Sequence, residues 1–244
     1  MKCFFYRTLI IFTIFTKFFL FCNTLAAQGS IGVGDNTRII FDLSEKRISL
    51  PVYNNSDNGY LFHAQIIDVD SGKYSRDFIP NPELVQLLPN KSRRIELVRL
   101  VEFKGLDTEK LYIFKGLFMP AKDVERADGF SMSLIYDVEM KLFVRPKELY
   151  SQNGAMSTIL EKIKFRSIDD SISIENNSKY YVTFNSISIN GKVIDIPEDI
   201  RMIAPNGAGF LKVKPNEGDK ISWSLINDSG FPTEQQITEI DSDE

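Results

Sequence analysis

A long alternation of apolar and other residues between positions 130 and 140 constrains the fold of this chain more than any other feature. Successive side chains of a β-strand point to opposite faces of its sheet, so a period of two indicates a strand with one face on a core. The pattern stops at Arg145-Pro146, because proline cannot donate a hydrogen bond to a sheet ladder. We therefore predict a strand over 131–144. The alternating apolar positions are Phe130, Met132, Leu134, Tyr136, Val138 and Met140.

Strand patterns also dominate the rest of the chain, whereas amphipathic helix patterns are scarce. Short β-rich runs separated by clusters of Gly, Asn, Asp and Pro are typical of β-sandwiches. One series of runs ends near Pro146 and a second begins after the loop-like segment 151–154, so we predict an all-β fold with two sandwich domains, 28–146 and 147–244. Residues 239–244 are expected to form a solvated acidic tail. The other predicted strands cover 38–41, 47–52, 60–69, 94–100, 111–118, 163–165, 171–175, 180–189, 192–196, 209–213 and 220–226.

Residues 1–27 have the pattern of a secretory signal peptide: basic residues flank an apolar run, and small residues follow. A membrane anchor is disfavoured because Lys17 interrupts the run, and a lipoprotein site at Cys22 is disfavoured by the bulky residue before it. Both cysteines, Cys3 and Cys22, would leave with this segment, so no disulfide is expected. The mature chain keeps 26 basic and 33 acidic residues, and its net charge of −7 argues against nucleic acid as a partner.

This sequence contains few residues and motifs that could support catalysis. His63 is the only histidine, and it is expected to be an ordinary strand residue facing solvent. Zinc sites of the Cys/His type and cysteine nucleophiles are therefore excluded, and a Ser-His-Asp triad would depend on His63 alone. Phosphate-binding glycine loops are also missing from the sequence. We expect a protein that binds, with no enzymatic activity, metal or cofactor.

Several short motifs occur in the same order as in a known family. The motifs are Thr37-Arg38-Ile39-Ile40-Phe41, Phe78-Ile79-Pro80-Asn81-Pro82, Lys141-Leu142-Phe143-Val144-Arg145-Pro146, Tyr180-Tyr181-Val182-Thr183 and Ile226-Asn227-Asp228-Ser229-Gly230. Each is weak alone, but together they run from about residue 36 to about 239, and by them the chain resembles the PapD-like periplasmic chaperones that assemble pili (fimbriae) in the chaperone–usher pathway. Departures at 81–83 and 176–179 concern loops.

The resemblance implies two immunoglobulin-like β-sandwich domains arranged at an angle, like a boomerang. It also implies a periplasmic protein that caps pilus subunits (pilins) and delivers them to an outer-membrane usher, and it leaves open whether the free protein associates with itself. In this family the subunit lacks the last strand of its sandwich, and the chaperone inserts one of its own strands in that place, which is called donor-strand complementation. The implied donor side chains are Met132, Leu134, Tyr136 and Val138.

Two groups of charged residues also match the family. Arg38 and Lys141 match the cations that hold the C-terminal carboxylate of the subunit, a task for which an arginine fork and a lysine point charge are suited. Lys141 has the opposite parity to Leu134, so strand twist, a bulge or the position of the cleft must reconcile the two roles. A cluster that links the two domains is matched by Glu109, Arg145 and Asp228.

A different class of function is the alternative. A structural pilin or adhesin subunit can also be built from immunoglobulin-like sandwiches. That reading is disfavoured because pilins usually carry a cysteine pair and a free N-terminal strand, and the mature sequence has neither.

Overall fold

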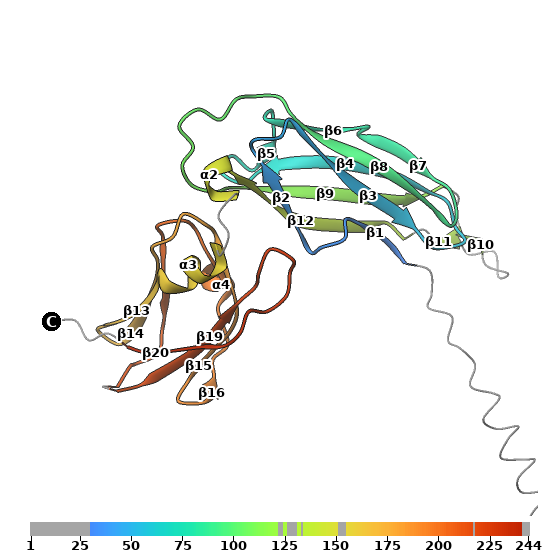
Figure 1. The fold of residues 1–244 in the computed structure, drawn as a ribbon. Coiled ribbons are helices and arrows are strands. Elements are labelled where there is room, and N and C mark those ends of the chain that lie inside the picture. Colours follow the sequence, from blue (N-terminus) through green and yellow to red (C-terminus); the bar gives the residue numbers. More distant parts are fainter. Residues whose placement is uncertain are drawn as a thin grey trace, which may run out of the picture.

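The computed structural model describes residues 30–121, 124–125, 131–132, 134–150, 155–216 and 218–240. It consists of two β-sandwiches with a few short helices, which confirms the predicted fold class. Figure 1 shows the two sandwiches meeting at one end, with their long axes at a wide angle. The predicted signal peptide and residues 241–244 of the predicted acidic tail lie outside the described residues.

The N-terminal sandwich packs a four-stranded sheet on a larger one. In the first sheet β1 (Ile31–Val33), β3 (Arg47–Asn54), β8 (Lys91–Arg99) and β6 (Phe78–Asn81) are neighbours in that order. The second sheet has the order β2 (Arg38–Asp42), β12 (Tyr136–Arg145), β9 (Lys110–Pro120), β4 (Tyr60–Asp68) and β5 (Lys73–Tyr74), with β7 (Leu84–Leu87) also paired to β4. Since β1 and β2 belong to different sheets, the chain changes sheets between them, at Gly34, which has φ of 70°.

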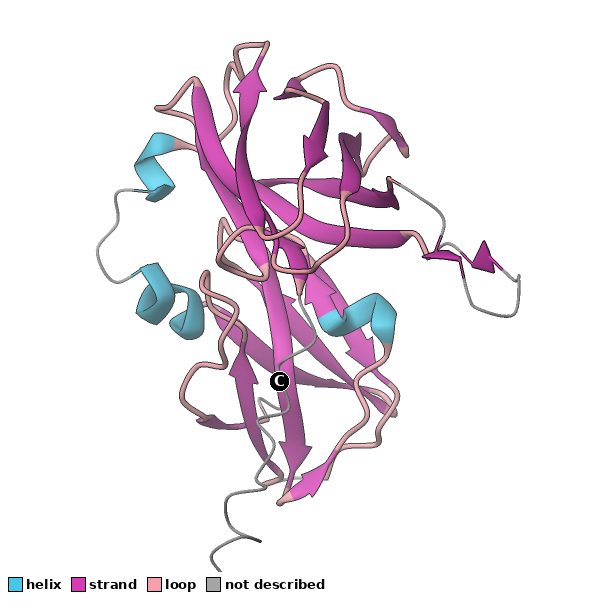
Figure 2. Cartoon of the chain, turned by 90° about the vertical axis from the view of Figure 1, so that its right-hand side faces the viewer, coloured by secondary structure: helices cyan, strands magenta, loops and turns pink. Residues whose placement is uncertain are grey.

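The C-terminal sandwich follows the short helices α2 (Lys147–Tyr150) and α3 (Ala155–Glu161). One sheet contains β13 (Ile163–Ile168), β14 (Ser171–Asn176) and β18 (Ala208–Leu211). The other has the order β16 (Lys192–Val193), β15 (Val182–Ile189), β19 (Lys220–Leu225) and β20 (Gln236–Glu239), with β17 (Met202–Ile203) paired to β15. The helix α4 (Glu198–Arg201) precedes β17, and Figure 2 separates the helices from the strands by colour.

Each sandwich encloses its own apolar core. In the first, aromatic rings such as Phe41, Phe62 and Phe118 are fully buried between the two sheets. In the second, Trp223 packs against Phe165 and Phe184, with ring centroids 5.6 and 6.1 Å apart. Within the described residues no helix is long and apolar enough to cross a membrane.

The prediction of one continuous strand over 131–144 was wrong. The structure divides this segment into β11 (Ser131–Met132), which pairs with β10 (Val124–Glu125), and β12, which begins at Tyr136. The ladder between β12 and β9 starts with Tyr136 opposite Phe118, and β9 ends two residues later at Pro120. Because Pro120 cannot donate to a ladder, β9 does not extend its pairing with β12 toward Leu134, and no other described strand does so. The predicted strand therefore breaks where its neighbour ends.

Candidate functional site

One edge of β12 is only partly paired. Along its whole length to Val144 the strand pairs with β9, but on its other side β2 accompanies it only from Lys141 to Arg145. Within the described part of the chain, residues 136–140 of β12 thus have no strand partner on that side. The cause is the change of sheet after β1, which pairs with β3 instead and leaves an open strand edge. A free edge of this kind can accept a strand from another chain.

The apolar side chains of this segment share one face of the strand. Val138 packs against the core of the N-terminal sandwich, as do Met140, Leu142 and Val144. Tyr136 lies at the end of this core, with its ring 6.3 Å from that of Tyr60, and Leu134 is 52% exposed. Of the predicted donor side chains, Val138 therefore belongs to the protein's own core, whereas Leu134 and Tyr136 project beyond it. The side chain of Met132, like Phe130 and Ser133, lies outside the described residues.

Arg38 and Lys141 lie side by side on the opposite face. The parallel ladder between β2 and β12 places them directly opposite each other. The ladder between β12 and β9 is regular from Tyr136 to Val144, so no bulge turns Lys141 toward the face of Val138. The two predicted functions therefore use opposite faces of one strand.

The surroundings of these two cations favour an anion. The guanidinium of Arg38 lies 5.4 Å from the ring centre of Phe143 and donates to the carbonyl oxygen of Ile226 at 3.3 Å, while its Nε is buried with no hydrogen-bond partner among the described residues. Burial lowers the pKa of Lys141, and the positive charge of Arg38 lowers it further. No ion pair is present for Lys141 in the part of the chain that the structure describes. A bound carboxylate would offset both the burial and the repulsion.

A cavity of about 570 Å³ opens beside Arg38, where β2 and β3 diverge into different sheets. Its lining combines apolar residues such as Ile39, Leu50 and Met140 with polar residues such as Asn36 and Ser229. Arg38 and Met140, a residue of the unpaired edge of β12, both line this space. It is large enough for several side chains of an incoming peptide segment.

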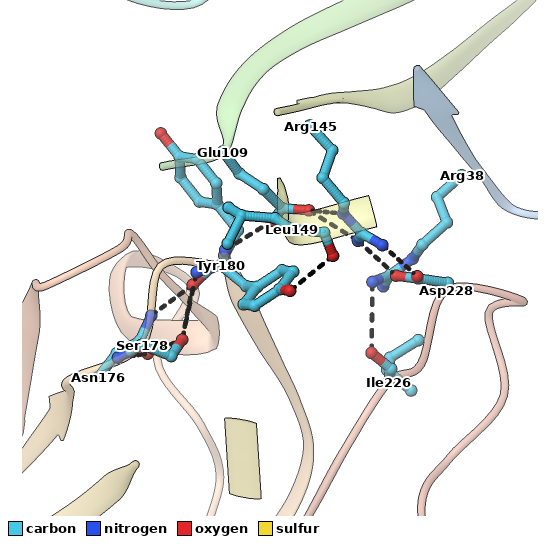
Figure 3. Close-up of polar contacts among 10 residues, drawn as sticks. Arg38, Glu109, Arg145, Leu149, Asn176, Ser178, Tyr180, Ile226 and Asp228 are labelled. Atoms are coloured by element: carbon cyan, nitrogen blue, oxygen red, sulfur yellow. Dashed lines mark hydrogen bonds and ion pairs between the residues drawn. The ribbon is translucent and has the colours of Figure 1, made fainter. Parts of the chain in front are cut away.

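Glu109, Arg145 and Asp228 form one ion-paired cluster between the two sandwiches (Figure 3). The Nε of Arg145 donates to Glu109 at 2.7 Å, and its two terminal nitrogens donate to the carboxylate of Asp228 at 2.7 and 2.9 Å. Glu109 also accepts a hydrogen bond from the backbone N–H of Tyr181 at 2.8 Å. Glu109 and Arg145 come from the N-terminal sandwich, and Tyr181 and Asp228 come from the C-terminal one. The cluster thus spans the domain boundary.

Burial changes the pKa values of the charged residues in this cluster. Glu109 and Arg145 are almost fully buried, whereas about half of the Asp228 side chain is exposed. Burial raises the pKa of Glu109, and the charge of Arg145 counteracts this only in part. Burial also opposes the charge of Arg145, but hydrogen bonds and attraction from Asp228 and Glu109 outweigh it and raise its pKa. Removal of Arg145 would leave the buried charge of Glu109 uncompensated.

Two contacts in this region lack a sequence signal strong enough to predict them. Phe143 has the same parity as Lys141 and Arg145, which places its ring beneath Arg38, but the pairing with β2 is needed to see this. Gly230, which has φ of 85°, packs directly on Thr37: a Cβ at this glycine would overlap the Oγ1 atom of Thr37 and lie 3.2 Å from its Cβ. The sequence predicted neither contact.

We expect Gly230→Ala to loosen the contact between the sandwiches. A side chain in this left-handed conformation costs about 1–2 kcal/mol, and here it also collides with Thr37. Gly191→Ala is the matched control, because Gly191 has φ of 81° but no atom within 4 Å of its Cβ position. Denaturant unfolding and small-angle scattering should show a larger loss of stability and a larger radius of gyration for Gly230→Ala. Equal effects of the two variants would contradict the proposed collision.

Within the described residues no group of His, Cys, Asp and Glu side chains could hold a metal ion. His63 lies on β4 with its Nε2 atom 3.5 Å from the amide nitrogen of Gln65.

Comparisons with known proteins agree with this architecture. The family model "Pili and flagellar-assembly chaperone, PapD N-terminal domain" matches residues 33–150, and "Pili assembly chaperone PapD, C-terminal domain" matches residues 158–237. The probable fimbrial chaperone protein ElfD from Escherichia coli is 29% identical over 223 residues, which cover 90% of this chain and 92% of the relative. The probable fimbrial chaperone LpfB from Escherichia coli is 26% identical over 224 residues, which cover 91% and 94%.

Solved structures show the same fold. The SafB chaperone of Salmonella enterica, solved in complex with the SafA pilin, gives a TM-score of 0.73 at 20% identity and covers 86% of this chain and 96% of its own. The Escherichia coli chaperone DraB gives a TM-score of 0.72 at 21% identity, with coverage of 87% and 99%. The two family models together span most of the described sequence. The chain therefore belongs to the PapD-like family of pilus assembly chaperones.

Proposed function

We propose that this chain is a periplasmic chaperone that binds fimbrial subunits by donor-strand complementation and delivers them to an outer-membrane usher. The observation that carries the proposal is the unpaired edge of β12 at residues 136–140, with the exposed Leu134 two residues before it. An unfinished subunit sandwich offers the complementary surface, because it lacks one strand and exposes the groove where that strand belongs. The edge of β12 would supply main-chain hydrogen bonds in place of the missing strand, and apolar side chains from one face of β12 would occupy the exposed groove.

Arg38 and Lys141 would determine how the subunit chain is aligned along β12. The carboxylate that ends a subunit chain would lie between Arg38 and Lys141 and accept charge-assisted hydrogen bonds from both. Because these side chains are fixed in the ladder of β2 and β12, the position of the carboxylate would set which subunit residues face Leu134 and Tyr136. The cavity beside Arg38 leaves space for the last residues of the subunit. The cluster of Glu109, Arg145 and Asp228 would keep the two walls of the cleft at a constant angle.

The same proposal implies where the protein acts and what drives transfer of the subunit. Residues 1–27 would direct export and be removed, and the mature chain would act in the periplasm. There the energy for handing on a subunit would come from the subunit's own completion by a neighbouring subunit, so no cofactor or catalytic residue is required.

Co-expression of the chain with fimbrial subunits from the same genome tests this function. The mature protein should co-purify from the periplasm with a subunit that is degraded or aggregated when expressed alone. Mass spectrometry identifies the captured partner, and Arg38→Ala serves as the non-binding control. Recovery of every subunit in equal amounts with and without the chain would refute the proposal.

The donor face can be tested at Leu134. Leu134→Glu should weaken capture of a subunit at least about tenfold, because burial of such a side chain contributes about 1.5–3 kcal/mol. The thermal midpoint of the free chaperone should hardly change, since Leu134 is half exposed. Ile135→Glu is the control: it introduces the same charge at the adjacent exposed position, which has the opposite parity. A greater loss of capture for Ile135→Glu, or a large fall in the midpoint of Leu134→Glu, would show that the donor face is the other one.

A further inference from the structure

The loop between β19 and β20 carries an exposed aromatic side chain, Phe231, whose ring is 66% exposed. Single exposed apolar side chains are common on protein surfaces, so exposure alone carries no argument. Two further properties of Phe231 bear on its role. Its backbone is fixed from both sides, and its loop rests on the segment that contains Arg38.

Hydrogen bonds fix the backbone around Phe231. Its N–H donates to Oδ1 of Asn227 at 3.0 Å, and its carbonyl oxygen accepts from the N–H of Asn227 at 2.8 Å. The N–H of Gly230 donates to the carbonyl oxygen of Asn227 at 2.9 Å, and the following Pro232 forms a β-bridge with Ile226. The ring is therefore displayed by a rigid turn, and ordering it on a partner restricts only two side-chain torsions.

The same loop is bound to the N-terminal sandwich near the cations. The carbonyl oxygen of Ile226 accepts from Arg38, the carboxylate of Asp228 pairs with Arg145, and Gly230 packs on Thr37. Figure 1 shows the loop, in red, reaching from β19 toward β12 and β1. Phe231 follows Gly230 directly, so its ring is held at a constant position relative to Arg38.

We propose that Phe231 is a third contact for the bound fimbrial subunit, packing against an apolar or aromatic side chain of the subunit close to its C-terminal carboxylate. The inference rests on the proposed function, because the subunit is the occupant of the neighbouring cation site. A carboxylate held by Arg38 brings the polypeptide that carries it past the loop. Charged contacts orient such a partner, and rigid aromatic side chains at the same interface supply much of the affinity.

The first experiment measures release of the subunit. Complexes are made with the subunit that the wild-type chain captures from the periplasm, and exchange is followed after adding excess untagged chaperone. Phe231→Ser should release the subunit at least about fivefold faster, as expected for loss of one aromatic contact. Ile237→Ser, at an exposed site on β20 of the same domain, should exchange at the wild-type rate. Both variants should keep the wild-type thermal midpoint.

A second experiment reports burial of the ring itself. Phe231→Trp adds a fluorophore to a chain whose only tryptophan, Trp223, is buried. The difference between the emission of variant and wild-type complexes should shift to the blue when the subunit is bound. A blue shift that appears in the free chaperone with rising concentration, or only on addition of the usher, would assign Phe231 to a different partner and overturn the inference.

The two proposals fail in distinguishable ways. If the wild-type chain captures no subunit, the proposed function is wrong. If it captures a subunit but Phe231→Ser exchanges at the wild-type rate and Phe231→Trp shows no shift, only the role of Phe231 is wrong.

Discussion

Lys141→Met should leave a folded chaperone that no longer accumulates a fimbrial subunit. One charge-assisted contact contributes about 1.5–3 kcal/mol, or about ten- to a hundredfold in affinity. Its loss also leaves the buried carboxylate of the subunit with a single partner, so periplasmic yield of the complex should fall to background. Arg38→Ala should have the same effect.

The stability of the free variant separates a binding role from a structural one. Burial and Arg38 lower the pKa of Lys141, so the unfolded chain binds this proton more tightly than the folded chain does. For such a base the positive charge costs stability at neutral pH, and the cost disappears only as the pH rises from the folded pKa to the unfolded pKa. Lys141→Met should therefore keep or raise the thermal midpoint while capture is lost. Lys192→Met, at an exposed site on β16, should change neither quantity.

Normal yields of subunit with both Lys141→Met and Arg38→Ala would contradict the carboxylate site. A marked fall in the midpoint of Lys141→Met would instead show that this ammonium stabilises the fold.

Arg145→Met should be the most destabilising single change in the interdomain cluster. It leaves the carboxylate of Glu109 buried without its cation, and removing one partner of a buried ion pair costs about 3–5 kcal/mol. Asp228→Asn should cost only about 1 kcal/mol, because half of that side chain is exposed to water. Urea unfolding measures both values, and small-angle scattering should show a more open molecule for Arg145→Met.

A double variant tests whether the cost comes from the unpaired carboxylate. Glu109→Gln combined with Arg145→Met removes both buried charges and should recover part of the lost stability. Arg166→Met is the control, because its pair with Glu175 lies at the surface and should contribute less than about 1 kcal/mol. Equal midpoints for wild type and Arg145→Met would show that the three charges are not energetically coupled.

The sequence predicted the sandwich fold well, because alternation reports directly on which side chains face a core. The sequence did not predict features that depend on which strands pair with each other. The strand over 131–144 breaks since β9 ends at Pro120, and nothing in the local pattern reveals which strand lies opposite. Strands of two residues such as β5 and β17, and the single-turn helices α2 and α4, are too short to leave a periodic signal.

The candidate site was predictable only in part, for the same reason. Parity alone places Lys141 and Arg145 on one face, but Arg38 joins them through a parallel register that no local pattern encodes. Glu109 and Asp228 have the sequence character of ordinary surface charges, and only the family resemblance singled them out. Their contact with Arg145 depends on how the two sandwiches meet, which is a property of the whole chain.

The parallel pairing of β2 with β12 has a consequence for the order in which the candidate site forms. Its two strands come from opposite ends of the sequence of the N-terminal domain, so Arg38 and Lys141 meet only when nearly all of that domain has been synthesised and folded. Pairings between distant segments form late, because the chain between them must first be ordered. A nascent chaperone would therefore have no carboxylate site with which to trap a subunit prematurely. Competence to bind would be the last property that the folding domain acquires.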